Sequence, residues 1–442
     1  MTRTSSTPEK PLCQPPRKLT DWLKPEGQRK VHSMIDKVYQ PKNLRVAWEK
    51  VKANRGSGGV DGQSLEAVEQ ELDEHLHRLH EDLRTDRYQP LPVRRVDIPK
   101  VGKPGEWRPL GIPAVIDRVC QQALLNRLEP IFEPLFDDSS FGYRPGRSAK
   151  DALRKMWREI EAGAEWIVDA DLKDYFGSID HDKLMTLVAQ RVADGRVLTL
   201  IERMLTAGAM QHGRLFPTTQ GTPQGGVVSP LLSNILLTPF DREMRRRGYQ
   251  LTRYADDWAV TCRSRQEAEA ALRCATKILA TLGVHLNLRK TRIVHVRQGI
   301  AFLGYTIRRG RRQLYLPATR IKSNARRGGL YAYPTQKSID RFKDTVRRKT
   351  QRRIPLSTAE LIRELNPVIR GWGEYYKRAH VRRLFHQLDG WVERRLWSHR
   401  FRRWRCPGWK VLPTARLRGE LGLVSLIGLI PSLAPRPRAA LS

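Results

Sequence analysis

The segment Arg253-Tyr-Ala-Asp-Asp-Trp-Ala-Val260 (RYADDWAV) places two adjacent carboxylates between two largely apolar segments. Residues 249–254 and 258–262 are rich in strand-forming side chains, so the pattern predicts a β-hairpin with the aspartates at its turn. Such a turn points Asp256 and Asp257 out of the sheet. An isolated Asp pair also has a simple structural explanation, because Asp is a common turn residue. A functional interpretation therefore needs a second acidic cluster.

That second cluster lies at the end of another predicted strand. Residues 166–172, WIVDADL, are rich in strand formers, and alternation along a strand puts Asp169 and Asp171 on one face. If the two clusters meet, their oxygens suit Mg²⁺, which prefers carboxylates together with substrate phosphates. Two such ions about 3.5–4 Å apart serve phosphoryl transfer. On the residues alone, a metal site and a structural pair of turns are equally supported.

The charge of the chain predicts a polyanionic partner. With 81 Lys and Arg against 46 Asp and Glu, the 442 residues carry a formal charge of +35. Nucleic acid is the natural candidate for such a partner. Hydrophobic residues make up 40% of the chain, enough to bury a sizeable core. The sequence therefore describes a folded, nucleic-acid-binding protein.

Nothing in the sequence indicates export or a membrane. No apolar run reaches the roughly 18 residues that span a bilayer. The N-terminus lacks the apolar core of a secretory signal, and the five cysteines are scattered without a CxxC pair. We expect a reducing cytoplasm and no membrane partner.

Hydrophobic spacing predicts strands interleaved with helices. This arrangement favours an α+β sheet domain over residues 85–310, followed by a basic helical region. The expected elements are a helix over 65–84, a basic hairpin within 88–112, strands at 166–172 and 301–307, helices at 181–191 and 266–282, and the hairpin around the Asp pair.

Several motifs in the chain resemble those of group II intron-encoded reverse transcriptases. YADD, DLKDYFGSIDH (171–181) and QGTPQGGVVSPLLSNILL (220–237) resemble three hallmark motifs of that family. LNPVIRGWGEYY (365–376) resembles the signature of the family's maturase module. Further matches are KPGEWRPLGIPAVIDRVCQQALL (103–125), FGYRPGRSAKDAL (141–153), LNLRKTRI (286–293) and FLGYTIRR (302–309). The motifs follow the family's order over most of the chain, and together they are specific.

The resemblance implies an α+β right-hand polymerase, with fingers and palm built on an antiparallel sheet, followed by an α-helical thumb/maturase domain. We expect Trp372, Tyr375 and Tyr376 of the maturase signature to serve mainly in helix packing. A remnant DNA-binding region is one interpretation of the C-terminal tail. The expected divisions are a disordered leader (1–30), a helical N-terminal extension (31–84), fingers and palm (85–310), thumb/maturase (311–410) and the tail (411–442).

The resemblance assigns Asp171, Asp256 and Asp257 as catalytic metal ligands, with Asp256 a stronger ligand than Asp257. It adds Leu172 to the metal site and to the nucleotide-binding residues. Lys290 resembles the lysine that protonates departing pyrophosphate, although a solvated surface lysine is the common alternative. Asp169 lies outside the matched positions, and we assign it a structural role.

The remaining residues assigned by resemblance bind the deoxynucleotide. Lys100 and Arg108 fall where the family's fingers grip the triphosphate, with Lys103 as a competitor for Lys100. Phe176 resembles the gate beneath the sugar that excludes a 2′-hydroxyl, and its alternative is a core aromatic. Gln224 and Gly225 resemble the nucleotide pocket.

The resemblance also implies cofactors and partners. The expected cofactor is two Mg²⁺ ions, with Mn²⁺ as a substitute, and the expected partners are dNTPs, group II intron RNA, and an RNA template with a DNA primer or target. We expect a bacterial cytoplasmic protein, nucleoid-associated when on DNA, without the endonuclease domain of longer relatives; the sequence does not distinguish monomer from dimer. A splicing cofactor with an idle polymerase, and an enzyme recruited to phage defence or spacer acquisition, remain as alternatives.

Overall fold

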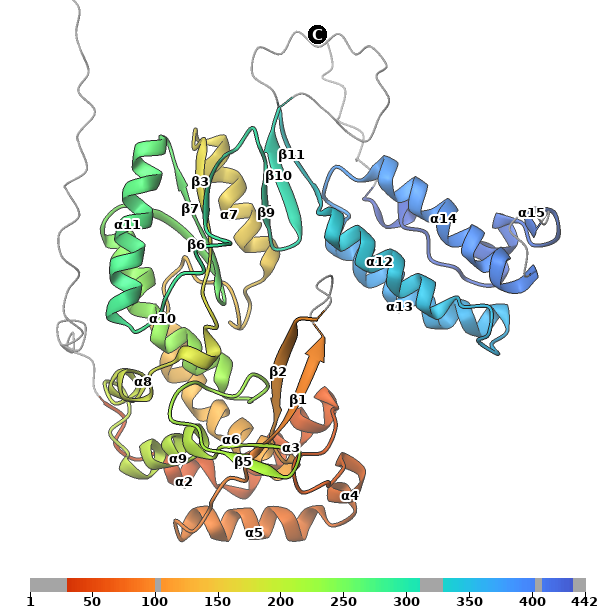
Figure 1. The fold of residues 1–442 in the computed structure, drawn as a ribbon. Coiled ribbons are helices and arrows are strands. Elements are labelled where there is room, and N and C mark those ends of the chain that lie inside the picture. Colours follow the sequence, from red (N-terminus) through yellow and green to blue (C-terminus); the bar gives the residue numbers. More distant parts are fainter. Residues whose placement is uncertain (1–29, 100–104, 311–328, 402–407, 432–442) are drawn as a thin grey trace, which may run out of the picture. The chain divides into compact units, whose positions relative to one another are not determined.

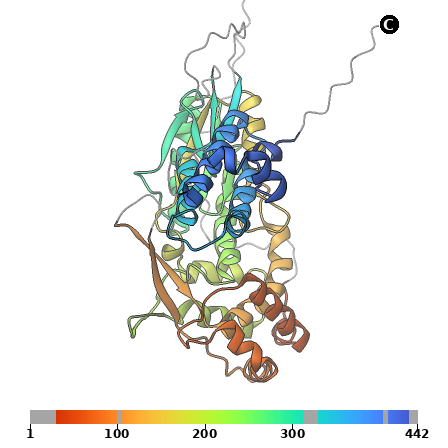
Figure 2. The ribbon, with the colours of Figure 1, turned by 90° about the vertical axis from the view of Figure 1, so that its right-hand side faces the viewer.

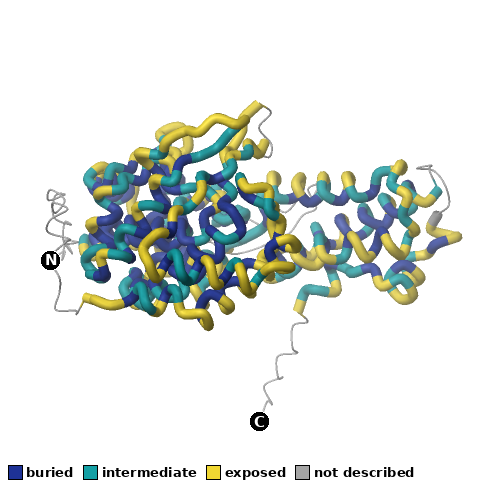
Figure 3. Tube along the Cα trace, turned by 90° about the horizontal axis from the view of Figure 1, so that it is seen from below, coloured by how far each residue is buried: buried dark blue, intermediate teal, exposed yellow. Residues whose placement is uncertain are grey.

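A computed structural model of the protein describes residues 30–99, 105–310, 329–401 and 408–431. The chain forms two compact units, one ending at Val294 and the other beginning at His295. The sequence analysis placed the corresponding boundary at residue 310, so the strands around residues 300–309 belong to the second unit. Figure 3 shows buried backbone concentrated inside the first unit and along the inner sides of the helices of the second. No helix among the described residues is long and apolar enough to cross a membrane.

Of the described residues in the first unit, those up to Arg84 form the helices α2 (Ile35–Val38), α3 (Pro41–Asn54), α4 (Leu65–Gln70) and α5 (Leu72–Arg84). The single helix predicted over residues 65–84 is therefore two helices. Glu71 separates them, with φ −119° and ψ 31°, outside the helical region. The break is one residue long, so the apolar side chains keep their helical spacing. Hydrophobic periodicity therefore does not reveal it.

A mixed sheet follows the N-terminal helices. β1 (Val93–Pro99) and β2 (Trp107–Ile112) pair antiparallel, which confirms the predicted basic hairpin. This hairpin extends away from the helices of its unit (Figures 1 and 2). β1 also pairs in parallel with β4 (Ala209–Gln211), which in turn pairs with β5 (Arg214–Phe216). The strand order is β2-β1-β4-β5, so this sheet is not purely antiparallel.

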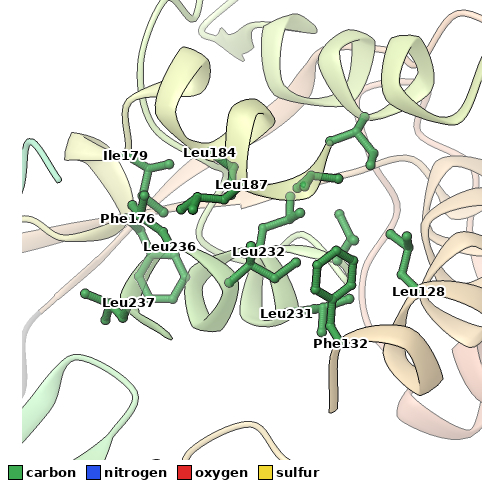
Figure 4. Packing of buried hydrophobic residues seen from close by; sticks show 14 of the residues in the cluster. Leu128, Phe132, Phe176, Ile179, Leu184, Leu187, Leu231, Leu232, Leu236 and Leu237 are labelled. Carbon is green, nitrogen blue, oxygen red and sulfur yellow. The ribbon is translucent and has the colours of Figure 1, made fainter. Parts of the chain in front are cut away.

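Two long helices form the centre of the first unit. α6 (Val115–Phe132, followed by the short η1, Glu133–Leu135) and α10 (Ser229–Arg246) are buried over most of their length, and α8 (His181–Val188) and α9 (Gly195–Thr206) complete the layer. A helix that is apolar on all sides has to be enclosed by others. Each fully buried Leu or Phe contributes about 1.5–3 kcal/mol. Figure 4 shows part of this core: Leu128, Phe132, Phe176, Ile179, Leu184, Leu187, Leu231, Leu232, Leu236 and Leu237.

The second sheet of this unit carries the acidic motifs. Its strand order is β6-β7-β3-β8, from β3 (Trp166–Asp171), β6 (Gln250–Tyr254), β7 (Asp257–Cys262) and β8 (Arg292–His295). α11 (Arg265–Thr281) packs on β3 and β7, while α7 (Ala149–Glu161) and α10 pack on β6 (Figure 1). The predicted hairpin at the Asp pair and the predicted α+β class are confirmed.

The second unit consists of a three-stranded sheet and a helical layer. Its elements are β9 (Ile300–Phe302), β10 (Tyr305–Arg309), β11 (Leu330–Pro334), α12 (Gln336–Lys349), α13 (Thr358–Tyr376), α14 (Arg382–Phe401), α15 (Gly408–Val411) and the short turns η3 (Arg416–Glu420) and η4 (Ile427–Leu429). The prediction of one strand over 301–307 is wrong, because the chain reverses between β9 and β10. Leu303 and Gly304 form the turn, and both have positive φ, as a type I′ turn requires.

The aromatic residues of the maturase signature pack around that turn. The Tyr375 hydroxyl donates to Leu303 O (2.7 Å), and the Tyr376 hydroxyl donates to Gly304 O (3.0 Å). Trp372 stacks on Phe342 of α12, with ring centroids 4.8 Å apart. The structure thus gives all three signature aromatics the packing role expected from the sequence.

The described residues after 408 pack against α13 and α14. Asn366 of α13 donates to Gly422 O (3.0 Å) and accepts from Val424 N (2.9 Å). Asp389 of α14 accepts from Leu426 N (2.8 Å). A Cβ on Gly373 would lie 2.5 Å from Leu429 Cδ1, so a larger residue there would require this leucine side chain to move. The described part of the tail is thus an integral layer of the second unit.

Candidate active site

The predicted catalytic acids meet at one end of two paired strands. β3 and β7 are antiparallel neighbours, and Asp171 lies directly opposite Asp257 in their register. Directly opposed residues have Cβ atoms about 4.5–5.5 Å apart and share a face of the sheet. Asp169 lies on that face two residues earlier, and Asp256 immediately precedes β7. The two acidic clusters of the sequence therefore form one site.

The turn that presents Asp256 is tight and strained. Tyr254 pairs with Asp257, which leaves Ala255 and Asp256 as a two-residue turn. Ala255 has φ 58°, a position where such turns prefer glycine. A Cβ on Gly142 would lie 2.3 Å from Ala255 N, so the FGY motif uses its glycine to place a second backbone directly against the turn.

Burial and mutual repulsion disfavour the charged forms of these acids. Burial raises the pKa of Asp256 above its ordinary value. The pKa of Asp257 rises to about 7, first through burial and then through the neighbouring charges of Asp256, Asp171 and Asp169. A bound cation would remove the repulsion that raises these pKa values.

Two cationic side chains lie against the acids of β3. Lys290 Nζ is 2.7 Å from Asp171 Oδ2. Arg292 Nε is 2.9 Å from Asp169 Oδ2, which gives Asp169 a structural partner of its own. Asn287 binds Asp171 twice, through its main-chain N to Asp171 O (2.8 Å) and through Nδ2 to Oδ2 (3.3 Å). The LNLRKTRI motif thus positions Asp171 from the neighbouring loop.

The donor set suits hard divalent cations. Asp171, Asp256 and Asp257 supply only carboxylate oxygens, the ligand type that Mg²⁺ and Mn²⁺ favour. Among the described residues, no three or more His, Cys, Asp or Glu side chains are already gathered at ligand distances from one point. Asp171 and Asp257 offer their oxygens from two neighbouring strands. Leu172 has a buried side chain, so it can contribute only through its main chain.

Arg108 and Gln224, two residues of the expected nucleotide pocket, contact each other. Arg108 Nε donates to Gln224 Oε1 at 2.6 Å, and Gly111 N donates to Gln224 O at 2.9 Å. Gly225 has φ 125°, and a Cβ there would lie 2.4 Å from Gly111 O. The TPQGG loop thus lies directly on β2 because its glycines carry no side chain. Lys100 and its competitor Lys103 lie outside the described residues.

Phe176 lies at the boundary between the site and the core. It opens the short η2 helix (Phe176–Ser178), five residues after Asp171. Its side chain is 7% exposed and packs in the cluster of Figure 4. Its carbonyl accepts from Thr222 N (2.8 Å), which joins this segment to the QGTPQGG motif. Because most of the Phe176 side chain is buried in the core, only the small exposed part of its ring is able to contact a nucleotide.

Sequence reasoning gave no role to two residues that shape the site. Asn287 lies within a quoted motif, but an Asn in a loop carries no signal of its partner. Arg253, in RYADDWAV itself, is fully buried beneath the Asp256 turn. The sequence does indicate a role for Arg253, because an Arg within an apolar strand has to find buried hydrogen-bond acceptors.

Comparison with known proteins identifies two family regions. Residues 98–307 match the model "Reverse transcriptase (RNA-dependent DNA polymerase)". Residues 339–413 match "Group II intron, maturase-specific domain". The first region contains both acidic clusters and the TPQGG loop, and the second contains the aromatic signature of α13.

Individual relatives agree with these matches. Protein YkfC of Escherichia coli (strain K12) is 33% identical over 336 residues, which cover 67% of this chain and 88% of that protein. The group II intron-encoded protein LtrA of Lactococcus lactis subsp. cremoris is 27% identical over 444 residues, covering 82% of this chain and 74% of LtrA. Among solved structures, a partial Cas6-RT-Cas1--Cas2 complex matches with 21% identity and a TM-score of 0.37 over 56% of this chain. The match spans 43% of that solved chain, less than half of its length.

The fold class and function expected from the sequence motifs are thereby confirmed. An α+β reverse transcriptase with a helical maturase domain copies RNA into DNA, uses divalent metal ions and has RNA among its partners. The chain belongs to the group II intron-encoded reverse transcriptases, RNA-directed DNA polymerases that also act as splicing maturases.

Proposed function

We propose that Asp171, Asp256 and Asp257 hold two Mg²⁺ ions, with Mn²⁺ as a substitute, and extend a DNA primer with dNTPs on an RNA template. The direct opposition of Asp171 and Asp257 supports this assignment most strongly, because it gathers carboxylates whose charges only a cation can balance. When bound, the ions supply activation of the attacking hydroxyl and stabilisation of the leaving pyrophosphate.

The residues around the acids bind and orient the nucleotide. Arg108 offers guanidinium donors to the triphosphate, and its contact with Gln224 holds it beside the TPQGG loop. Gly225 is exposed, so its main chain is open to a ligand. Lys290 holds a proton on Nζ within reach of Asp171, and we assign it to the departing pyrophosphate. Lys100 completes the grip on the triphosphate in this proposal.

The second unit binds group II intron RNA through a cationic cavity. Gln351, Arg352, Arg353, Arg395 and Ser398 line a cavity of about 560 Å³ beside the C-terminal end of α12. Burial, and then the charges of Arg347 and Arg352, lower the pKa of Arg395 below its ordinary value. Nearby, Lys343 and Arg347 lie over the ring of Trp391. A phosphodiester backbone brings negative charge to the guanidinium groups of this cavity.

The proposal places the protein in the bacterial cytoplasm and at the nucleoid while it is engaged on target DNA. Its bacterial relatives and the charge of +35 support this placement.

The metal-ligand assignment predicts a sharp difference between neighbouring carboxylates. Asp171→Ala and Asp256→Ala each lose at least about 100-fold in Mg²⁺-dependent primer extension on RNA, because electrostatic stabilisation at the reacting phosphate is lost. Asp169→Asn, on the same face but bound to Arg292, stays within about fivefold of the unmodified protein. Full activity in either alanine variant contradicts the assignment, and retained intron splicing in all three variants confirms that each one folds.

The raised pKa of Asp257 predicts a pH-dependent cost to the metal-free fold. The folded pKa of about 7 exceeds the unfolded value near 3.9, so stability is greatest below about pH 4 and falls as the pH rises to 7. Asp257→Asn removes this cost, so at pH 8 its free energy of unfolding exceeds that of the unmodified protein by roughly 1–3 kcal/mol and it unfolds at a higher temperature. The difference narrows at pH 5 and closes below about pH 4, where the carboxyl is protonated in both states. Thermal unfolding in EDTA measures it, and an equal gap at both pH values counts against the charge cluster.

The gate assignment of Phe176 predicts a change in sugar selectivity. Phe176→Val raises the efficiency of rNTP incorporation relative to dNTP at least about tenfold, because the space beneath the 2′ position opens. Leu184→Ala, which also removes volume from the core of Figure 4, serves as the matched control and leaves the ratio unchanged. Steady-state incorporation kinetics give both ratios. Equal selectivity in the two variants would reduce Phe176 to a packing residue.

The cationic cavity predicts where intron RNA binds. Arg352→Gln combined with Arg353→Gln weakens intron RNA binding about 10-fold to 100-fold at physiological salt and lowers the salt dependence of log Kd by about 2. Arg363→Gln with Arg370→Gln removes equal charge from exposed positions on α13 and changes the affinity less than threefold. Filter-binding titrations at several salt concentrations measure both. Equal losses in the two double variants would show that net charge, not the cavity, determines affinity.

A further inference from the structure

Arg253 lies completely buried beneath the turn that carries Asp256, with 0% of its side chain exposed. Its guanidinium has five N–H donors, and each one finds an acceptor. Nε and Nη2 donate to the two carboxylate oxygens of Asp241 at 2.7 and 2.6 Å. Nη2 also donates to Ser140 Oγ (2.8 Å), and Nη1 donates to Asn234 Oδ1 and to Ala255 O, both at 3.0 Å.

These acceptors come from three separate parts of the chain. Asp241 and Asn234 belong to α10, Ser140 belongs to the segment before the FGY motif, and Ala255 is the first residue of the turn itself. Main-chain bonds add to the junction, because Arg253 N donates to Ser139 O and Arg253 O accepts from Phe141 N. One side chain thereby fixes the base of the hairpin to a helix and to a neighbouring strand-like segment.

The same group of contacts encloses the turn from its other side. Asn234 Nδ2 donates to Gly142 O at 2.9 Å, and Gly142 lies directly against Ala255 N. The positive φ of Ala255 costs about 1–3 kcal/mol and persists only where surrounding contacts determine the conformation. The Arg253 bond to Ala255 O is one of those contacts, and Asp256 is the next residue along the chain.

Stability alone is a weak explanation for this arrangement. Burying two charges costs several kcal/mol of desolvation per ion, and an apolar pair of similar volume is often as stable or more so. What an apolar pair cannot do is bind a carbonyl oxygen and so orient a peptide unit. We propose that Arg253 is a positioning residue for DNA synthesis: by holding the Ala255 carbonyl, its guanidinium sets the direction in which the turn presents the Asp256 carboxylate.

The test separates positioning from folding by replacing the ion pair with an apolar pair. Arg253→Met combined with Asp241→Leu leaves no charge unpartnered, so the double variant folds with a melting temperature near or above that of the unmodified protein. Its kcat for primer extension falls at least 30-fold, and the Mg²⁺ concentration for half-maximal rate rises at least threefold. KM for the primer–template changes less than threefold, because the nucleic-acid-binding surface is untouched. Arg253→Lys keeps the charge but lacks the planar fork, and it recovers only part of kcat.

Asp194→Asn is the matched control for stability. Asp194 is a buried carboxylate that accepts from Met34 N and Ile35 N and caps α9, without any contact to the hairpin. Its loss lowers the melting temperature, yet kcat measured well below that temperature stays within twofold. All variants are assayed at a fixed interval below their own melting temperatures.

The outcomes are distinct. The proposal rests on the proposed role of Asp256, so Asp256→Ala is assayed beside the other variants. Full activity in Asp256→Ala overturns the site assignment itself. An inactive Asp256→Ala together with an Arg253→Met/Asp241→Leu variant of normal kcat and Mg²⁺ dependence overturns only the positioning role, and so does a loss in Asp194→Asn as large as that in the double variant.

Discussion

Asp171 and Asp257 face each other across the pairing of β3 with β7, and the rest of the site accommodates the repulsion between them. Burial raises the pKa of Asp257 to about 7, and the neighbouring charges of Asp256, Asp171 and Asp169 add to the rise. Lys290 balances one of the charges from the loop that follows α11. The sheet that holds these acids is in turn enclosed by apolar helices, so the acids are partly cut off from solvent. In our proposal, a bound cation relieves the repulsion that remains among these carboxylates.

The chain separates its two kinds of charge by unit and by depth. The acids to which we assign the chemistry are few and lie at strand ends of the first unit, where Asp171 is half-buried and Asp257 is exposed. The cations to which we assign nucleic-acid binding include, in the second unit, the arginines that line a cavity and Arg347 over the ring of Trp391. A basic surface raises the local concentration of phosphate chains, whereas the acid cluster acts only where one phosphate reaches it. The net charge of +35 reflects the many cations, and it gives no sign of the acid cluster.

Sequence patterns predicted elements well where the signal is local. Alternation placed Asp169 and Asp171 on one face, and apolar flanks around the Asp pair gave the hairpin correctly. Strand register is not local, so the opposition of Asp171 and Asp257 followed from the family motifs and not from spacing. The acceptors of Arg253 are also distant in sequence, and Ser140 is 113 residues away. Short breaks such as the FLGY turn were missed because the apolar side chains on both sides of Leu303 and Gly304 read as one continuous strand.

Leu303 and Gly304, the two residues of the FLGY turn, are under different structural constraints. Tyr375 and Tyr376 recognise it through the carbonyl oxygens of Leu303 and Gly304, groups that every residue possesses. The side chain at position 303 is therefore free to drift among residues that tolerate positive φ. Position 304 has no such freedom, because a Cβ there would lie 2.7 Å from the Tyr376 hydroxyl. Over evolutionary time this hairpin should preserve its shape while the identity of its first turn residue changes.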